Sequence, residues 1–150
     1  MYMKELTFTV LMVLILGCNR KKSDIENSKP MNSGYVADYN NKKLINALCD
    51  RIIQKGDTVA FNELQQIYEI SEHSEELLFI STVMAEKYSY WRAYEANYVI
   101  LYYNRDKTQN RRRFAFYNLI RAYELGYKHA EKTLNEEFPN GIPKSNEYWK

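Results

Sequence analysis

The sequence has few of the residues that enforce turns or carry most enzyme chemistry. Of its 150 residues, 2 are cysteine, 2 are histidine, 3 are proline and 5 are glycine. Scarce proline and glycine leave few enforced turns, which favours helices over a sandwich or barrel of short strands. The formal net charge of +2 lacks the strong basic excess that a nucleic-acid-binding protein needs. We therefore expect no nucleic-acid partner.

Motifs of catalysis and cofactor binding are missing as well. The sequence contains no glycine-rich phosphate loop, CxxC, HExxH or GxSxG. Its two histidines, His73 and His129, are far apart and offer little for general acid–base catalysis. Glu69, Glu72 and Glu76 flank His73, but carboxylates are favoured at a helix start in any case. We predict a protein that is not an enzyme and has no cofactor and no metal site.

The apolar run near the N-terminus is short. It follows Lys4 and extends from Leu6 to Leu16, with threonine at two positions. A membrane-spanning helix needs about 20 apolar residues, so the run has the length of a signal-peptide core. We predict a signal peptide over residues 1–17.

The run ends in LILGC at residues 14–18, which resembles the lipobox of bacterial lipoproteins. The resemblance implies cleavage before Cys18 and a diacylglycerol on its sulfur. Ile15 departs from the pattern, in which leucine is commonest, and an ordinary cleaved signal is the alternative. Asn19 stands where an aspartate would imply inner-membrane retention. We expect a lipid anchor in the bacterial cell envelope, at the outer membrane facing the periplasm or the surface.

The polar segment after Cys18 is predicted to be a flexible tether that ends at residue 36. Its few apolar groups cannot offset the entropy of ordering it. Cys49, the only other cysteine, lies on a helical stripe with Leu44, Leu48 and Ile52. We interpret it as a small apolar side chain of the core.

The remainder contains an internal repeat. Ala60, Ala93 and Ala130 recur at intervals of about 35 residues, which is typical of stacked helix pairs. Columns of similar residues flank them: Gly56, Ser89 and Gly126 four residues before, Leu64, Asn97 and Leu134 four after, and Tyr68, Leu101 and Phe138 eight after. Asn97 is the exception among apolar residues. The small residue of the first column suits a left-handed helix cap, and the alanine allows close helix packing.

The segments 56–68 and 115–134 resemble Sel-type repeats, which are relatives of the tetratricopeptide repeat. The resemblance implies an all-α domain over residues 37–139, a short solenoid of about three antiparallel helix pairs. We place its helices at 38–54, 58–70, 73–88, 90–104, 110–125 and 127–138. Asp57 or Thr58 is expected to cap the second helix, and Ser71 or Ser74 the third. Residues 140–150 are predicted to be a tail, and whether Trp149 folds back is open.

The helix 90–104 carries the candidate binding residues. Ala93, Asn97 and Leu101 define its buried face, and Trp91, Tyr98 and Tyr102 share another side, with Arg105 close by. Tryptophan, tyrosine and arginine dominate binding hot spots. Packing against neighbouring helices is the alternative. The basic run Arg111-Arg112-Arg113 offers a site for a phosphate or lipid head group, but we favour a solvated turn.

We therefore expect a lipid-anchored envelope protein whose helical repeats bind a protein or peptide partner. An immunity-type lipoprotein that neutralises a toxin is the alternative, and an envelope enzyme comes third. The membrane contact is expected through lipidated Cys18.

Overall fold

The computed structural model describes residues 30–105 and 107–149, and all regular elements in these ranges are helical. The predicted all-α class is confirmed. The α-helices are α2 (Ser33–Asn40), α3 (Lys42–Lys55), α4 (Thr58–Ile70), α5 (Leu78–Tyr88), α6 (Trp91–Tyr103), α7 (Gln109–Glu124), α8 (Glu131–Glu137) and α9 (Ser145–Tyr148). Two 3₁₀ turns, η1 (Ser74–Leu77) and η2 (Lys128–Ala130), precede α5 and α8. None of the described helices is long and apolar enough to cross a membrane.

The helix bounds follow the sequence prediction closely, with differences at both ends. The first predicted helix is divided at Asn41 into α2 and α3, and α2 begins at Ser33. Residues 33–36, predicted as tether, are therefore helical. The predicted tail contains the short helix α9. The predicted signal peptide and Cys18 lie outside the described residues.

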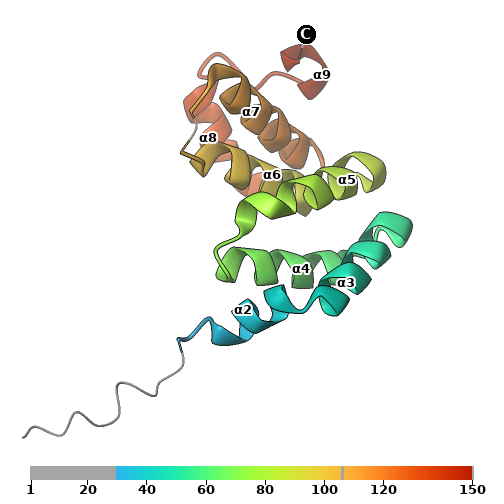
Figure 1. Ribbon diagram of the computed structural model, residues 1–150. Helices are drawn as coiled ribbons and strands as arrows, with labels where there is room; N and C mark the ends of the chain where they lie inside the picture. The colour runs from blue at the N-terminus through green and yellow to red at the C-terminus, as the bar shows by residue number, and fades with distance from the viewer. Residues whose placement is uncertain (1–29, 106, 150) are drawn as a thin grey trace, which may run out of the picture. The chain divides into compact units, whose positions relative to one another are not determined.

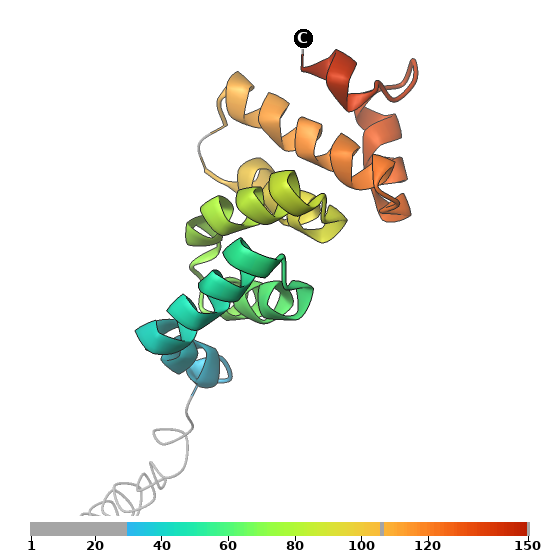
Figure 2. The same ribbon diagram turned by 90° about the vertical axis from the view of Figure 1, so that its right-hand side faces the viewer.

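The helices belong to a compact unit that starts at Asn32 and in which they follow one another in chain order (Figures 1 and 2). Consecutive helices pack in the pairs α3–α4, α5–α6 and α6–α7, while α3 also contacts α5. At one end α2 packs on α3 and α4, and at the other α8 and α9 pack on α7. A stack of this kind buries the middle helices on two sides and the terminal ones on one.

Three left-handed residues end helices at the positions of the predicted glycine column. Gly56 caps α3 with a φ of 63°, and Ser89 caps α5 with a φ of 51°. Gly126, with a φ of 105°, follows the end of α7. In each case the chain reverses into the next helical segment, whose first turn includes one of the repeated alanines. Ala60, Ala93 and Ala130 are all buried. The predicted columns therefore coincide with three turns between helical segments.

Ser89 is the strained member of this column, because a side chain in the left-handed region costs about 1–2 kcal/mol. We expect Ser89→Gly to raise the free energy of unfolding by up to about 1 kcal/mol, since the extra chain entropy of glycine offsets part of the relief. Chemical denaturation measures the change. Glu86→Gly, at an exposed position inside the same helix, should instead destabilise by about 1 kcal/mol. A destabilising Ser89→Gly would show that the serine is not strained.

Side-chain caps fix the starts of three described helices: Asn41 caps α3, Asp57 caps α4 and Thr108 caps α7. The carboxylate of Asp57 accepts hydrogen bonds from the amides of Val59 and Ala60, both at 3.0 Å, so the predicted cap of α4 is confirmed. The predicted cap of the next helix is wrong. Ser71 ends α4, and η1 begins after His73 without a side-chain cap. The chain turns here with Glu72 at a φ of 68°, so neither serine occupies the capping position.

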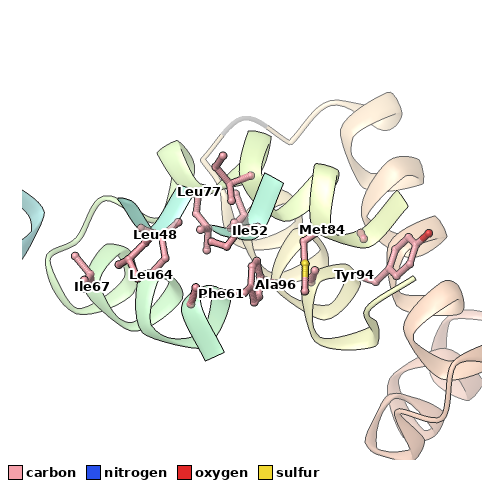
Figure 3. Packing of buried hydrophobic residues seen from close by; sticks show 14 of the residues in the cluster. Leu48, Ile52, Phe61, Leu64, Ile67, Leu77, Met84, Tyr94 and Ala96 are labelled. Atoms are coloured by element: carbon pink, nitrogen blue, oxygen red, sulfur yellow. The ribbon is translucent and has the colours of Figure 1, made fainter. Parts of the chain in front are cut away.

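The larger of two hydrophobic cores is built from α3, α4, α5 and α6. Its buried residues include Leu48 and Ile52 of α3, Leu64 of α4 and Met84 of α5 (Figure 3). Tyr94 of α6 is also buried in this cluster. Cys49 is half-buried at the edge of this core, and burial raises the pKa of its thiol. That environment suits packing better than thiolate chemistry.

The second core joins α6 to α7 and α8. Its buried residues are Tyr98, Leu101, Ala115, Phe116, Leu119, Ile120, Ala130 and Leu134. Helix α6 contributes to both cores, with α5 on one side and α7 on the other. This position explains why more of its surface is buried than a single apolar stripe predicts.

A chain of hydrogen-bonded, buried polar side chains links α5, α6 and α7. Ser81 of α5, Asn97 of α6 and Asn118 of α7 are each 0–1% exposed. The hydroxyl of Ser81 donates to Oδ1 of Asn97, whose amide donates to Oδ1 of Asn118 at 3.0 Å. The Asn118 amide in turn donates to the backbone oxygen of Phe114 at 2.8 Å. Asn97 breaks the apolar pattern of its column because it links α5 to α7.

Candidate functional site

Two of the four candidate binding residues lie together at the C-terminal end of α6. The rings of Tyr98 and Tyr102 are stacked, with centroids 5.1 Å apart and an interplanar angle of 24°. Both rings also meet Phe116 of α7 edge-on, at 5.8 and 5.6 Å. Tyr98 is only 8% exposed, and burial raises the pKa of its hydroxyl to about 12. Tyr98 therefore packs in the second core, and Tyr102 presents the accessible ring.

Cations flank the ring of Tyr102. The Lys107 ammonium lies 5.6 Å from the ring centroid and donates to the Tyr102 backbone oxygen at 3.5 Å. The guanidinium of Arg112 lies 5.7 Å from the same centroid and 4.9 Å from that of Phe116. Arg112 also pairs with Glu137 of α8. Together Leu101, Tyr102, Lys107 and Arg112 line a pocket of about 230 Å³, which we call the Tyr102 pocket.

Trp91 and Arg105, the other two candidates, are not part of this pocket. Trp91 stacks on Tyr127 with centroids 5.0 Å apart and an interplanar angle of 11°. It shares a side of α6 with Tyr98, but two helical turns, about 10 Å, separate them. Arg105 is exposed just after α6. Sequence periodicity correctly finds the common side, but it cannot show that the two rings meet different partners.

The basic run Arg111-Arg112-Arg113 near the start of α7 contacts three other helices, α6, α8 and α9. Arg111 donates to the backbone oxygens of Leu101 and Ile100 at 3.2 and 3.4 Å, in the last turn of α6. Cations at that end of a helix are stabilising, because its carbonyl groups carry partial negative charge. Arg112 reaches α8, as described above, and Arg113 reaches α9. The run lies within α7 rather than in a turn, while Arg112 and Arg113 are exposed to solvent, as we expected. Its guanidinium groups are engaged by the protein.

The acidic residues around His73 have separate partners. The His73 ring stacks on Tyr39 of α2 at 3.7 Å, and the Tyr39 hydroxyl donates to Glu76 at 2.8 Å. Glu69 instead accepts a hydrogen bond from Gln65 at 2.7 Å. Within residues 30–105 and 107–149, no group of three or more histidine, cysteine or acidic side chains could hold a metal ion.

The C-terminal helix α9 is held to α7 by polar contacts. The backbone amide and the hydroxyl of Ser145 both donate to the Glu124 carboxylate at 2.8 Å. Arg113 donates to the backbone oxygens of Tyr148 and Trp149, both at 3.2 Å. The Trp149 ring packs near Phe114, with centroids 5.6 Å apart. Trp149 thus folds back onto the domain, which the sequence left open.

Acid should release α9. Burial raises the pKa of Glu124, but hydrogen bonds from Ser145 and Arg121 lower it by more, so it lies below the usual value near 4.5. Because its pKa is lower in the folded state, ionised Glu124 stabilises docked α9 at pH values above its unfolded-state pKa. This stabilisation is lost as the pH falls through the folded-state pKa. We expect the fluorescence of Trp149, measured in a Trp91→Phe variant, to shift as the pH falls below about 4.5.

Two substitutions identify the titrating group in that experiment. Glu124→Gln should give the acid-state emission of Trp149 already at neutral pH, whereas Glu147→Gln, at an exposed position on α9, should leave the transition in place. Far-UV circular dichroism follows the other helices. An unchanged transition in Glu124→Gln would assign it to another carboxylate.

Sequence reasoning missed Phe116, Tyr127 and Glu137 as neighbours of the candidate residues. Each lies later in the chain than α6, Phe116 in α7, Glu137 in α8 and Tyr127 between α7 and η2, so no local spacing connects it to Tyr102 or Trp91. Among the neighbours of Tyr102, only Lys107 and Arg112 could be found from the sequence, because they belong to the basic segment that follows the aromatic helix. Comparison with known protein families, with curated proteins and with solved structures found no match.

Proposed function

We propose that this chain is a lipid-anchored protein of the bacterial envelope whose helical domain, a short tetratricopeptide-like solenoid, binds a protein or peptide partner. The lipobox-like LILGC at residues 14–18 supports the anchor. Equivalent left-handed caps at Gly56, Ser89 and Gly126 support a repeated helix pair. Stacked repeats provide extended surfaces for partner segments.

The Tyr102 pocket is the observation that carries the binding proposal. It combines an accessible aromatic ring with Lys107 and Arg112, and aromatic and arginine side chains are enriched at the centres of interfaces. Arg112 is already paired with Glu137, so Lys107 supplies the charge most available to a partner. A partner segment that places an apolar side chain and a carboxylate here would match the pocket.

The anchor is tested by metabolic labelling with a fatty acid. The protein should incorporate the label and fractionate with the outer membrane, and Cys18→Ala should abolish both. Cys49→Ala is the matched control, because it removes the other cysteine and should leave labelling unchanged. Labelling that persists in Cys18→Ala would refute the lipidation of this residue.

Partner binding is tested by cross-linking in cells with tagged full-length protein, followed by mass spectrometry. A partner recovered with the native protein should be lost with a Tyr102→Ala/Lys107→Ala variant. Phe79→Ala, which removes an aromatic ring that is 70% exposed on α5, is the control and should retain the partner. The purified partner should then bind in solution with the same dependence. Equal recovery by all three proteins would exclude the Tyr102 pocket as the binding surface.

A further inference from the structure

A second pocket lies between α7 and α9, away from the residues of the Tyr102 pocket. It has a volume of about 380 Å³ and is lined by Tyr117, Arg121, Ser145, Asn146 and Trp149. This volume is near the lower end of the range for small-molecule sites, so the pocket suits a single ring better than an extended peptide. We call it the Trp149 pocket.

The aromatic wall of the Trp149 pocket is held in place by the protein. Two hydrogen bonds from Ser145 to Glu124 and two from Arg113 to the last turn fix α9. Trp149 nevertheless remains 50% exposed. The four polar contacts fix the backbone that carries Trp149, and its half-exposed indole, which packs against Phe114 and Tyr117, offers an apolar face. A ligand can bury that face with little further ordering of the chain.

The second aromatic residue and a cation complete the pocket. The ring centroids of Tyr117 and Trp149 are 5.4 Å apart and their planes are tilted by 51°, so the two rings form an angled surface. Arg121 is oriented by its ion pair with Glu124 at 2.8 Å and by the Tyr94 ring, 5.3 Å from its guanidinium carbon. A guanidinium has five N–H donors. The pair with Glu124 uses Nη1 and a further hydrogen bond goes to Tyr94, so the remaining donors are those available to a ligand.

The two arginines near the pocket disfavour a cationic ligand. Arg113 lies 5.4 Å from the centroid of the Trp149 ring, so the cation–π position on that ring is already taken by a side chain. Arg121 adds a second cation at the pocket, and its ion pair with Glu124 at 2.8 Å offsets part of that charge. A quaternary ammonium group would be repelled by both. An anionic group is favoured, and a carboxylate matches the planar geometry of arginine.

We propose that the Trp149 pocket binds a sugar ring that carries a carboxylate, such as a uronic acid. The C–H face of the ring would pack on Trp149 and Tyr117, through dispersion and burial of apolar surface. Arg121 would donate to the carboxylate, and the amide of Asn146 would hydrogen-bond to ring hydroxyls. This site is independent of the partner surface around Tyr102 and of the lipid anchor.

The test uses full-length protein in detergent micelles, with binding followed by ligand-observed NMR. The probes are D-glucuronate and D-glucose, which differ only in the carboxylate. We expect glucuronate to bind with a Kd of about 1 mM and glucose about tenfold more weakly. Trp149→Ala should weaken glucuronate binding at least about tenfold, and Arg121→Lys should reduce the preference for glucuronate over glucose. Glu147→Gln is the matched control on α9 and should bind as the native protein does.

Each other outcome overturns the proposal. Glucuronate binding that is undetectable, or unchanged in Trp149→Ala, would mean that the pocket is not a saccharide site. Equal affinities for glucose and glucuronate would show that Arg121 does not bind the carboxylate. Tighter binding of N-acetylphenylalaninate than of glucuronate would make this a site for a peptide carboxyl terminus. Circular dichroism of each variant separates loss of binding from loss of fold. Asn146→Ala serves as a second, milder substitution in the pocket lining.

Discussion

Asn97→Leu is expected to lower the free energy of unfolding by about 3 kcal/mol, although leucine stands at the equivalent position of the other two repeat copies. Asn97 is 1% exposed and bridges Ser81 and Asn118. Leucine would leave Oδ1 of Asn118 buried without its donor, and an unsatisfied buried polar group costs about 1–3 kcal/mol. The Ser81 hydroxyl loses less, because the backbone oxygen of Leu78 lies 3.1 Å away as an alternative acceptor.

A double-mutant cycle separates the network from simple packing. Asn118→Leu alone orphans the Asn97 amide, whereas the double variant removes both partners. The double variant should therefore be more stable than the sum of the two single losses predicts, by at least about 1 kcal/mol. Chemical denaturation of all four proteins provides the measurement. Additive losses would mean that the two asparagines contribute independently. A stabilising Asn97→Leu would mean that the repeat pattern is a better guide than the hydrogen bonds.

Gly56→Ala should also destabilise the protein by about 3 kcal/mol, for two separable reasons. With a φ of 63°, Gly56 occupies the left-handed region, where any side chain is strained. A Cβ atom at this position would also overlap the ring of Tyr88. That ring cannot move freely, because the Tyr88 hydroxyl donates to the backbone oxygen of Ile53 at 2.8 Å. Thermal and chemical unfolding measure the total effect.

Repeating Gly56→Ala in proteins that also carry a substitution at Tyr88 separates the backbone strain from the clash with the ring. In a Tyr88→Ala protein, Gly56→Ala should cost only the backbone strain, about 1–2 kcal/mol. In a Tyr88→Phe protein, which keeps the ring but lacks the hydroxyl that holds it, the cost should be intermediate. Gly34→Ala is the control on an ordinary helical glycine with no atom within 4 Å of the new methyl group, and it should be neutral or slightly stabilising. An equal cost of Gly56→Ala in all three backgrounds would exclude the clash.

The candidate binding surface was only partly accessible from the sequence. Helical periodicity placed Trp91, Tyr98 and Tyr102 on one side of a helix, because that side depends only on the angle between residues. It could not distinguish the buried Tyr98 from the accessible Tyr102, since α7 covers one and leaves the other half-exposed. The two cations beside Tyr102 come from the following loop and from α7, and their approach to the ring depends on how α7 packs.

The sequence by itself determined the helical class, the positions of most helices and the turns of the repeat. These properties depend on local chemistry: scarce proline and glycine, apolar periodicity, the Asp57 cap and left-handed positions at Gly56 and Gly126. The tertiary structure alone decided that Asn97 is a polar link, that three consecutive arginines reach three different helices, and that Trp149 lies against α7. Each of these contacts joins residues from different helices, so their positions are set by packing across the stack, which no spacing along a single helix encodes.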